Sequence, residues 1–75
     1  MPKLKAIKVE KFIQILQELG FEEHRQKGSH KSFYHSDGRV LTVPFHPGKE
    51  IPVGLLSKII KFQLKISREE FEKLL

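Results

Sequence analysis

The chain of 75 residues has no cysteine, no tryptophan and no long hydrophobic run. Without cysteine it can hold neither a disulfide framework nor a thiolate zinc site, and it has no cysteine nucleophile. This absence fits a reducing compartment, so we expect a cytoplasmic location. The lysines near the N-terminus are not followed by an apolar segment of signal-peptide length, and no run reaches the roughly 18 apolar residues of a membrane-spanning helix. No contact with a membrane is therefore expected.

Length and composition predict one small folded domain, residues 1–75. Hydrophobic residues make up 39% of the chain and include six Phe, which is too high for a disordered protein. A chain of this size buries only about 60% of the surface that it exposes when unfolded. Any active site should therefore be shallow and lie at the surface.

Positive charge is concentrated in the middle of the chain, whose overall net charge is +5. Residues 24–66 contain eight Lys and Arg against two acidic residues, whereas the two ends mix both signs. A concentrated basic region is typical of proteins that bind phosphate groups, and mixed charges are typical of a surface that only maintains solubility. The middle of the chain is therefore where a phosphate-bearing ligand is expected.

Helical periodicity predicts two main helices and a short final one. The apolar stripe of the first helix comprises Val9, Phe12, Ile13, Leu16 and Leu19. Gly20 follows this stripe as a C-terminal cap would. The second helix begins around Pro52, and its stripe comprises Leu55, Leu56, Ile59 and Ile60. Ser67 and Glu70 form a capping box for a helix that ends at Leu75, with an apolar side made of Phe71, Leu74 and Leu75.

Strands are expected between the two main helices, at residues 21–26, 31–35 and 39–45. Gly28-Ser29 separates the first strand from the second. Ser36-Asp37-Gly38 forms a hairpin turn because Asp and Gly tolerate the positive φ of tight turns. Residues 46–50 are expected to form a loop. The order α-β-β-β-α predicts an α+β fold, in which two helices cover one face of a three-stranded antiparallel sheet and leave the other face open.

Gly28-Ser29-His30 is the strongest candidate for chemistry. The imidazole side chain can accept and donate a proton near neutral pH. RNA carries its own nucleophile, the 2′-hydroxyl, so His30 acting as general base or acid could cleave it without a metal. The glycine and the hydroxyl would let the backbone approach a phosphate that Lys27 and Lys31 bind. The expected RNA-binding residues are Arg25, Lys27, Gly28, Ser29, Lys31, Lys58 and Lys61.

The residue that handles the second proton is not determined by the sequence. His35 is an odd number of positions from His30 in the same strand, which places the two rings on opposite faces. Tyr34 shares a face with His30 and is the better candidate. The hydroxyl of Ser29 is equally well explained by a local bond in the turn.

The remaining basic and histidine side chains have ordinary explanations. Lys58, Lys61 and Lys65 recur on one helix face and are also what the solvated side of an amphipathic helix would show. His24 and His35 fit ordinary strand positions, and His46 fits a bond to a loop carbonyl. No helical HxxxH pair, no HxH on a strand and no thiolate is present, so we expect no metal site and no cofactor.

Taken together, these residues resemble the HicA toxins of bacterial toxin–antitoxin pairs, which have a fold like that of double-stranded RNA-binding domains. The resemblance runs almost end to end. It rests on Leu19-Gly20-Phe21, Arg25-Gln26-Lys27-Gly28-Ser29-His30, Asp37-Gly38, Val43-Pro44 with His46, and Glu50-Ile51. It implies that His30 is the catalytic residue of an endonuclease that cuts messenger RNA. It also implies that a HicB antitoxin binds the toxin and blocks it, and we expect the toxin alone to be a monomer.

Two other functions remain open. A non-catalytic module could bind duplex RNA through backbone contacts, as the element order and the basic middle allow. Such modules commonly carry basic residues at the start of the last helix, where this chain has the segment 52–56, which contains none. An adaptor could instead dock a protein on its open sheet face, and this possibility merges with the toxin if the docked protein is an antitoxin.

Overall fold

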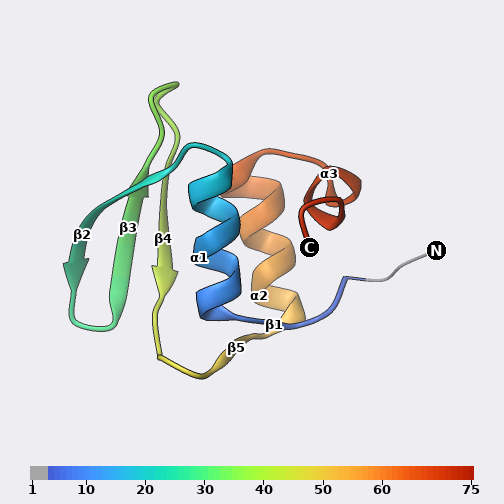
Figure 1. Ribbon diagram of the computed structural model, residues 1–75, viewed down its shortest axis with the longest axis horizontal. Helices are drawn as coiled ribbons and strands as arrows, with labels where there is room; N and C mark the ends of the chain where they lie inside the picture. Colours follow the sequence, from blue (N-terminus) through green and yellow to red (C-terminus); the bar gives the residue numbers. More distant parts are fainter. Residues whose placement is uncertain (1–3) are drawn as a thin grey trace.

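The computed structural model describes residues 4–75 and has the expected α+β architecture (Figure 1). Its central sheet is antiparallel, in the order β2-β3-β4. These strands are β2 (Glu22–Lys27), β3 (His30–Tyr34) and β4 (Val40–Pro44). The expected strands are thus confirmed, with a shift of one residue at each end.

The helices are α1 (Val9–Glu18), α2 (Val53–Lys58) and α3 (Arg68–Glu72). Pro52 is the residue before α2, and its extended backbone leads directly into the first turn. The Ser67 hydroxyl accepts the backbone N–H of Glu70 at 3.0 Å, so the predicted cap of the last helix is confirmed. Within residues 4–75, no helix is long and apolar enough to cross a membrane.

Two features were not predicted from the sequence. A second, two-stranded sheet pairs β1 (Ile7–Lys8) with β5 (Glu50–Ile51) and so joins the start of α1 to the start of α2. The second helix also continues without a break into a π-helical segment, η1 (Ile59–Leu64). This segment ends at Lys65, whose left-handed backbone (φ 58°) stops the helix.

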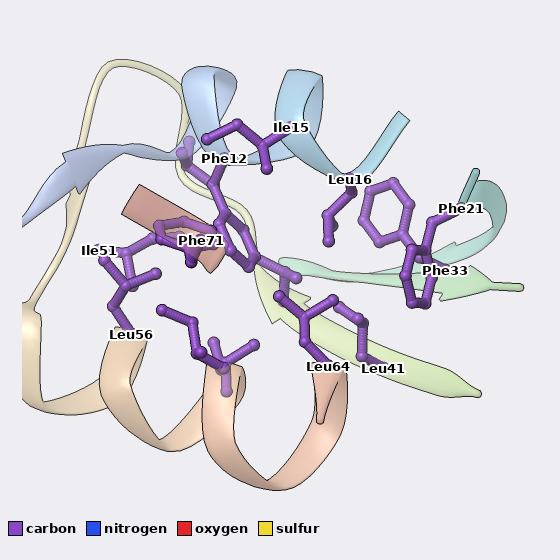
Figure 2. Packing of buried hydrophobic residues seen from close by; sticks show 14 residues of the cluster. Phe12, Ile15, Leu16, Phe21, Phe33, Leu41, Ile51, Leu56, Leu64 and Phe71 are labelled. Atoms are coloured by element: carbon purple, nitrogen blue, oxygen red, sulfur yellow. The ribbon is translucent and has the colours of Figure 1, made fainter. Parts of the chain in front are cut away.

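One hydrophobic core joins the sheet to all three helices (Figure 2). Its buried residues are Val9, Phe12, Ile15, Leu16, Phe21, Phe33, Leu41, Val43, Ile51, Leu56, Ile59, Ile60, Leu64 and Phe71. The prediction for Leu55 was wrong, because this residue lies on the outer side of the first turn of α2 and is 37% exposed. Leu64 is buried instead, at the end of η1. Ile15 was missed, and the predicted apolar residue Leu75 is exposed.

The strand register defines the two faces of the sheet. Phe33 on β3 lies opposite Leu41 on β4, and both are buried in the core that α1 and α2 cover. Side chains alternate between faces along a strand. His30, Ser32 and Tyr34 therefore point to the other, uncovered face, which we call the open face. The prediction that one sheet face stays free of helices is confirmed.

Candidate active site

The site begins at the two-residue turn between β2 and β3. Lys27 and His30 are paired across this turn, which leaves Gly28 and Ser29 as its two central residues. Gly28 has a positive φ of 60°, as the first central residue of a type II′ turn requires. The Gln26 side chain donates to the Gly28 carbonyl at 3.2 Å, and the Ser29 carbonyl accepts the backbone N–H of Phe45. The turn is thus tied to β2 and to the residue that follows β4, and it places His30 at the start of β3.

His30 lies on the open face between two different neighbours. Lys27 is opposite it on β2, and Pro44 is opposite it on β4. The residue is exposed, and no side chain or backbone group among residues 4–75 is hydrogen-bonded or ion-paired to its imidazole. The ring is therefore free to contact a ligand laid across the sheet.

Basic and hydroxyl side chains continue along the open face from His30. The next row across the strands consists of Arg25, Ser32 and Thr42, because Ser32 is paired with Arg25 on one side and with Thr42 on the other. Arg25, Lys27 and Thr42 are exposed. The sequence-predicted residues Arg25, Lys27 and His30 thus come together on one surface. A phosphate at His30 would have two cations within reach of long side chains.

Lys31 lies on the covered side of the sheet, not on the face of His30. Its ammonium is 3.1 Å from the Glu23 carboxylate and 4.1 Å from the centre of the Phe45 ring, and its side chain is only 16% exposed. Glu23 faces Phe33 on the same side because β2 contains an irregularity between Glu23 and Arg25 that shifts the register. Lys31 therefore already has an anionic and an aromatic partner.

Lys58 and Lys61 belong to the helical layer and are not brought together with His30. Both are exposed. The Lys61 ammonium lies 5.4 Å from the centre of the Phe62 ring. Lys61 also borders a groove of about 410 Å³ that it shares with Arg68 of α3.

The candidates for the second proton are placed as the strand alternation predicted. Tyr34 shares the open face with His30, but four residues along a strand separate the two by about 13 Å. His35 is half-buried on the helical side, where its Nε2 is 3.1 Å from the Leu19 carbonyl and its Nδ1 is 3.0 Å from the backbone N of Asp37. His35 thus anchors the β3–β4 turn to the end of α1, a role that its sequence position did not indicate.

His46 follows β4 at the same end of the sheet as His30. It is two residues beyond Pro44, the partner of His30, and it borders a pocket of about 190 Å³ together with Lys49 and Leu55. Within residues 4–75, no carbonyl is bonded to its imidazole, so the expected loop bond is not formed.

The loop that carries His46 is held by α1. The Glu10 carboxylate accepts the backbone N–H of Gly48 at 2.8 Å, and the Lys49 carbonyl accepts the backbone N–H of Val9 at 3.0 Å. The bond from Gly48 is the main cause that lowers the pKa of Glu10 below its ordinary value. In the β3–β4 turn, the backbone N–H of Arg39 likewise lowers the pKa of Asp37.

Comparison with protein-family models finds a family that the chain matches. The model described as HicA toxin of bacterial toxin–antitoxin covers residues 9–65. This range extends from the start of α1 to the end of η1 and includes the whole open face. A search of curated proteins finds no match.

Proposed function

Since the chain belongs to the HicA toxin family of bacterial toxin–antitoxin systems, we propose that it is an endoribonuclease that cleaves messenger RNA, with His30 as its catalytic residue. The observation that carries the proposal is the position of His30: an exposed, unbonded imidazole on the open face, directly opposite the Lys27 cation. In this arrangement, a group that transfers protons and a group that binds phosphate face the same ligand.

The chemistry needs only these groups and the RNA itself. The 2′-oxygen attacks the adjacent phosphorus while its proton passes to a base, and the bond from phosphorus to the 5′-oxygen breaks as that oxygen takes up a proton. The products are a 2′,3′-cyclic phosphate and a free 5′-hydroxyl. His30 serves one of the two proton transfers, a contribution of about 10² to 10⁴ in rate. Lys27 and Arg25 stabilise the charge on the phosphate oxygens.

The turn before His30 contributes through its backbone. Because Gly28 carries no side chain and nothing lies within 4 Å of the position that its Cβ would occupy, a phosphate can approach the turn closely. Lys31 is held by Glu23 and Phe45 and adds positive charge from beneath the sheet. Lys58 and Lys61 would meet only parts of the RNA that extend beyond the sheet.

The antitoxin partner is the second part of the proposal. Membership of a toxin–antitoxin family implies a partner, and we infer that a HicB-like antitoxin covers the open face and so blocks His30. The toxin alone is a monomer in this proposal, and it acts in the cytoplasm, where messenger RNA is translated.

The test compares purified wild type with His30→Ala and with His24→Ala, a matched control from the exposed surface of β2. Wild type and His24→Ala should cleave a transcript at equal rates, and His30→Ala should be slower by about 10²-fold or more. All three should unfold at similar temperatures because both residues are exposed. Intact transcripts with wild type would refute the enzyme and favour a module that only binds RNA, whereas unchanged cleavage by His30→Ala would refute the catalytic role of His30.

A further inference from the structure

Three exposed apolar side chains adjoin one another at the end of the open face away from His30. Tyr34 is 48% exposed, Val40 is 58% exposed and Phe62 is 64% exposed. Tyr34 and Val40 are opposite each other on β3 and β4. Val40 and Phe62 border the same pocket of about 360 Å³. The three residues, which we call the apolar strip, thus continue from the sheet onto η1.

The strip is held in place by bonds between its elements. The Gln63 side-chain oxygen accepts the backbone N–H of Thr42 at 3.1 Å, which joins η1 to the outer edge of β4. The Arg39 guanidinium donates to the carbonyl of Leu64, the next residue of η1, at 2.6 Å. Phe62 lies next to Gln63 in the chain, so its position relative to β4 is fixed although its ring is in solvent. A preformed surface of this kind binds a ligand without first having to be ordered.

Charge around the strip favours an anionic ligand. Lys65 borders the pocket, and the Lys61 ammonium lies 5.4 Å from the centre of the Phe62 ring. The one acidic residue of the pocket, Asp37, is paired with Arg39 at 2.8 Å. Glu22, opposite Tyr34 on β2, is the acidic group on the far side of the strip. Aromatic rings beside lysines match a ligand in which flat bases alternate with phosphates.

We propose that Tyr34, Val40 and Phe62 form a subsite that stacks unpaired bases of an RNA strand whose phosphate lies at His30. The proposal rests on the proposed function and narrows its substrate to single-stranded RNA. In a duplex the faces of the bases are covered by their neighbours, so only an unpaired strand can offer them to an aromatic ring. Tyr34 is about 13 Å along β3 from His30, so the stacked base belongs to a nucleotide near the cleaved bond and not to the bond itself.

The proposal assigns different roles to the ring and the hydroxyl of Tyr34. Stacking needs the ring alone, so Tyr34→Phe, which keeps the ring, should retain the affinity of the wild type for single-stranded RNA. Tyr34→Leu keeps an apolar side chain but removes the flat ring, as does Phe62→Leu. Truncation of a stacking aromatic typically weakens binding of single strands by about fivefold or more. Lys61 lies beside the Phe62 ring. It would therefore contact the RNA at the apolar strip and not at His30.

The experiment measures RNA affinity in a His30→Ala background, in which cleavage does not consume the probe. A fluorescent RNA of mixed sequence is titrated as a single strand and again after annealing to its complement. Tyr34→Leu and Phe62→Leu should each weaken binding of the single strand by about fivefold or more and leave duplex binding unchanged. Tyr34→Phe and the control Val53→Ala, an exposed apolar residue outside the strip, should change neither affinity.

Two results would overturn the subsite: unchanged affinity of both leucine variants for the single strand, or an equal loss of affinity for duplex RNA. The assay is independent of catalysis. If wild type binds RNA through the strip but does not cleave it, the enzyme fails and the subsite stands. If wild type cleaves RNA and the leucine variants bind RNA with unchanged affinity, the subsite fails and the enzyme stands.

Discussion

The side-chain amide oxygen of Gln63 accepts the backbone N–H of Thr42 at 3.1 Å. This bond gives the outer edge of β4 a partner in the helical layer, and it crosses from a π-helical segment to a strand 21 residues earlier. An edge strand otherwise presents unpaired N–H groups to solvent. The contact therefore both protects the edge and fixes the position of η1.

Loss of this bond should lower the free energy of unfolding by a measurable amount. Gln63→Ala should lower the free energy of unfolding by about 1 kcal/mol, the usual net value of such a hydrogen bond. Gln14→Ala on the exposed side of α1 is the control, and it should change stability by less than about 0.5 kcal/mol. Urea denaturation of the two variants gives the comparison, and equal values for both would show that the bond contributes nothing.

Two glycines should respond to alanine in opposite directions. Gly28 has a φ of 60° and open space around its missing Cβ, so Gly28→Ala should cost about 1–2 kcal/mol through backbone strain alone. Gly54 lies within α2 and also has open space, so Gly54→Ala should stabilise by about 0.5–1 kcal/mol. Urea midpoints measure both. A stabilised Gly28→Ala would contradict the left-handed turn that places His30.

The last helix should be essential to the core. Phe71 is fully buried, and its ring centre is 5.9 Å from that of Phe12 in α1. Phe71→Ala should cost about 3–5 kcal/mol. A domain of this size has a total stability of roughly 4–11 kcal/mol, so we expect a large fall in melting temperature or loss of the cooperative transition. Leu75→Ala, at a half-exposed position, should melt close to the wild type.

Acid should weaken the attachment of the loop that carries His46. The hydrogen bond from Gly48 lowers the pKa of Glu10 in the folded state below its ordinary value of 4.5. The folded state thus favours the ionised carboxylate, which adds stability above pH 4.5 that is lost as the pH falls through the lower folded value. Wild type should exceed Glu10→Gln in stability at neutral pH, and this difference should shrink in acid. A difference that does not depend on pH would show that the charge has no part in it.

Local chemistry made much of the fold predictable. Gly20, Ser67 and the Asp37-Gly38 turn each act within a few residues, and all three are where the sequence indicated. The predicted stripe placed both Leu55 and Leu56 in the core, but in the first turn of α2 only Leu56 is buried, and Leu55 is on the outer side. The β1–β5 pair and η1 depend on contacts between distant segments, which a single sequence does not encode as a local pattern.

The site was predictable to the same extent. Strand alternation correctly placed Tyr34 with His30 and His35 on the other face. Lys31 was expected at the phosphate, but its partner Glu23 depends on the register shift in β2, which nothing in the sequence marks. Phe62 was not singled out, because its exposure follows from the way η1 docks beside β4. The sequence alone does not show which apolar residues remain exposed, because that depends on how the helices and strands pack.

The composition of the outer strand β2 affects how copies of the protein associate through their sheets at high concentration. All six residues of this outer strand are exposed, and none is aliphatic or aromatic apart from the His24 ring. If two copies aligned their β2 strands side by side in register, Glu would face Glu and Arg would face Arg, and the repulsion would oppose the growth of fibrils. The strand that borders the candidate site thus disfavours parallel, in-register stacking of copies through its sheet.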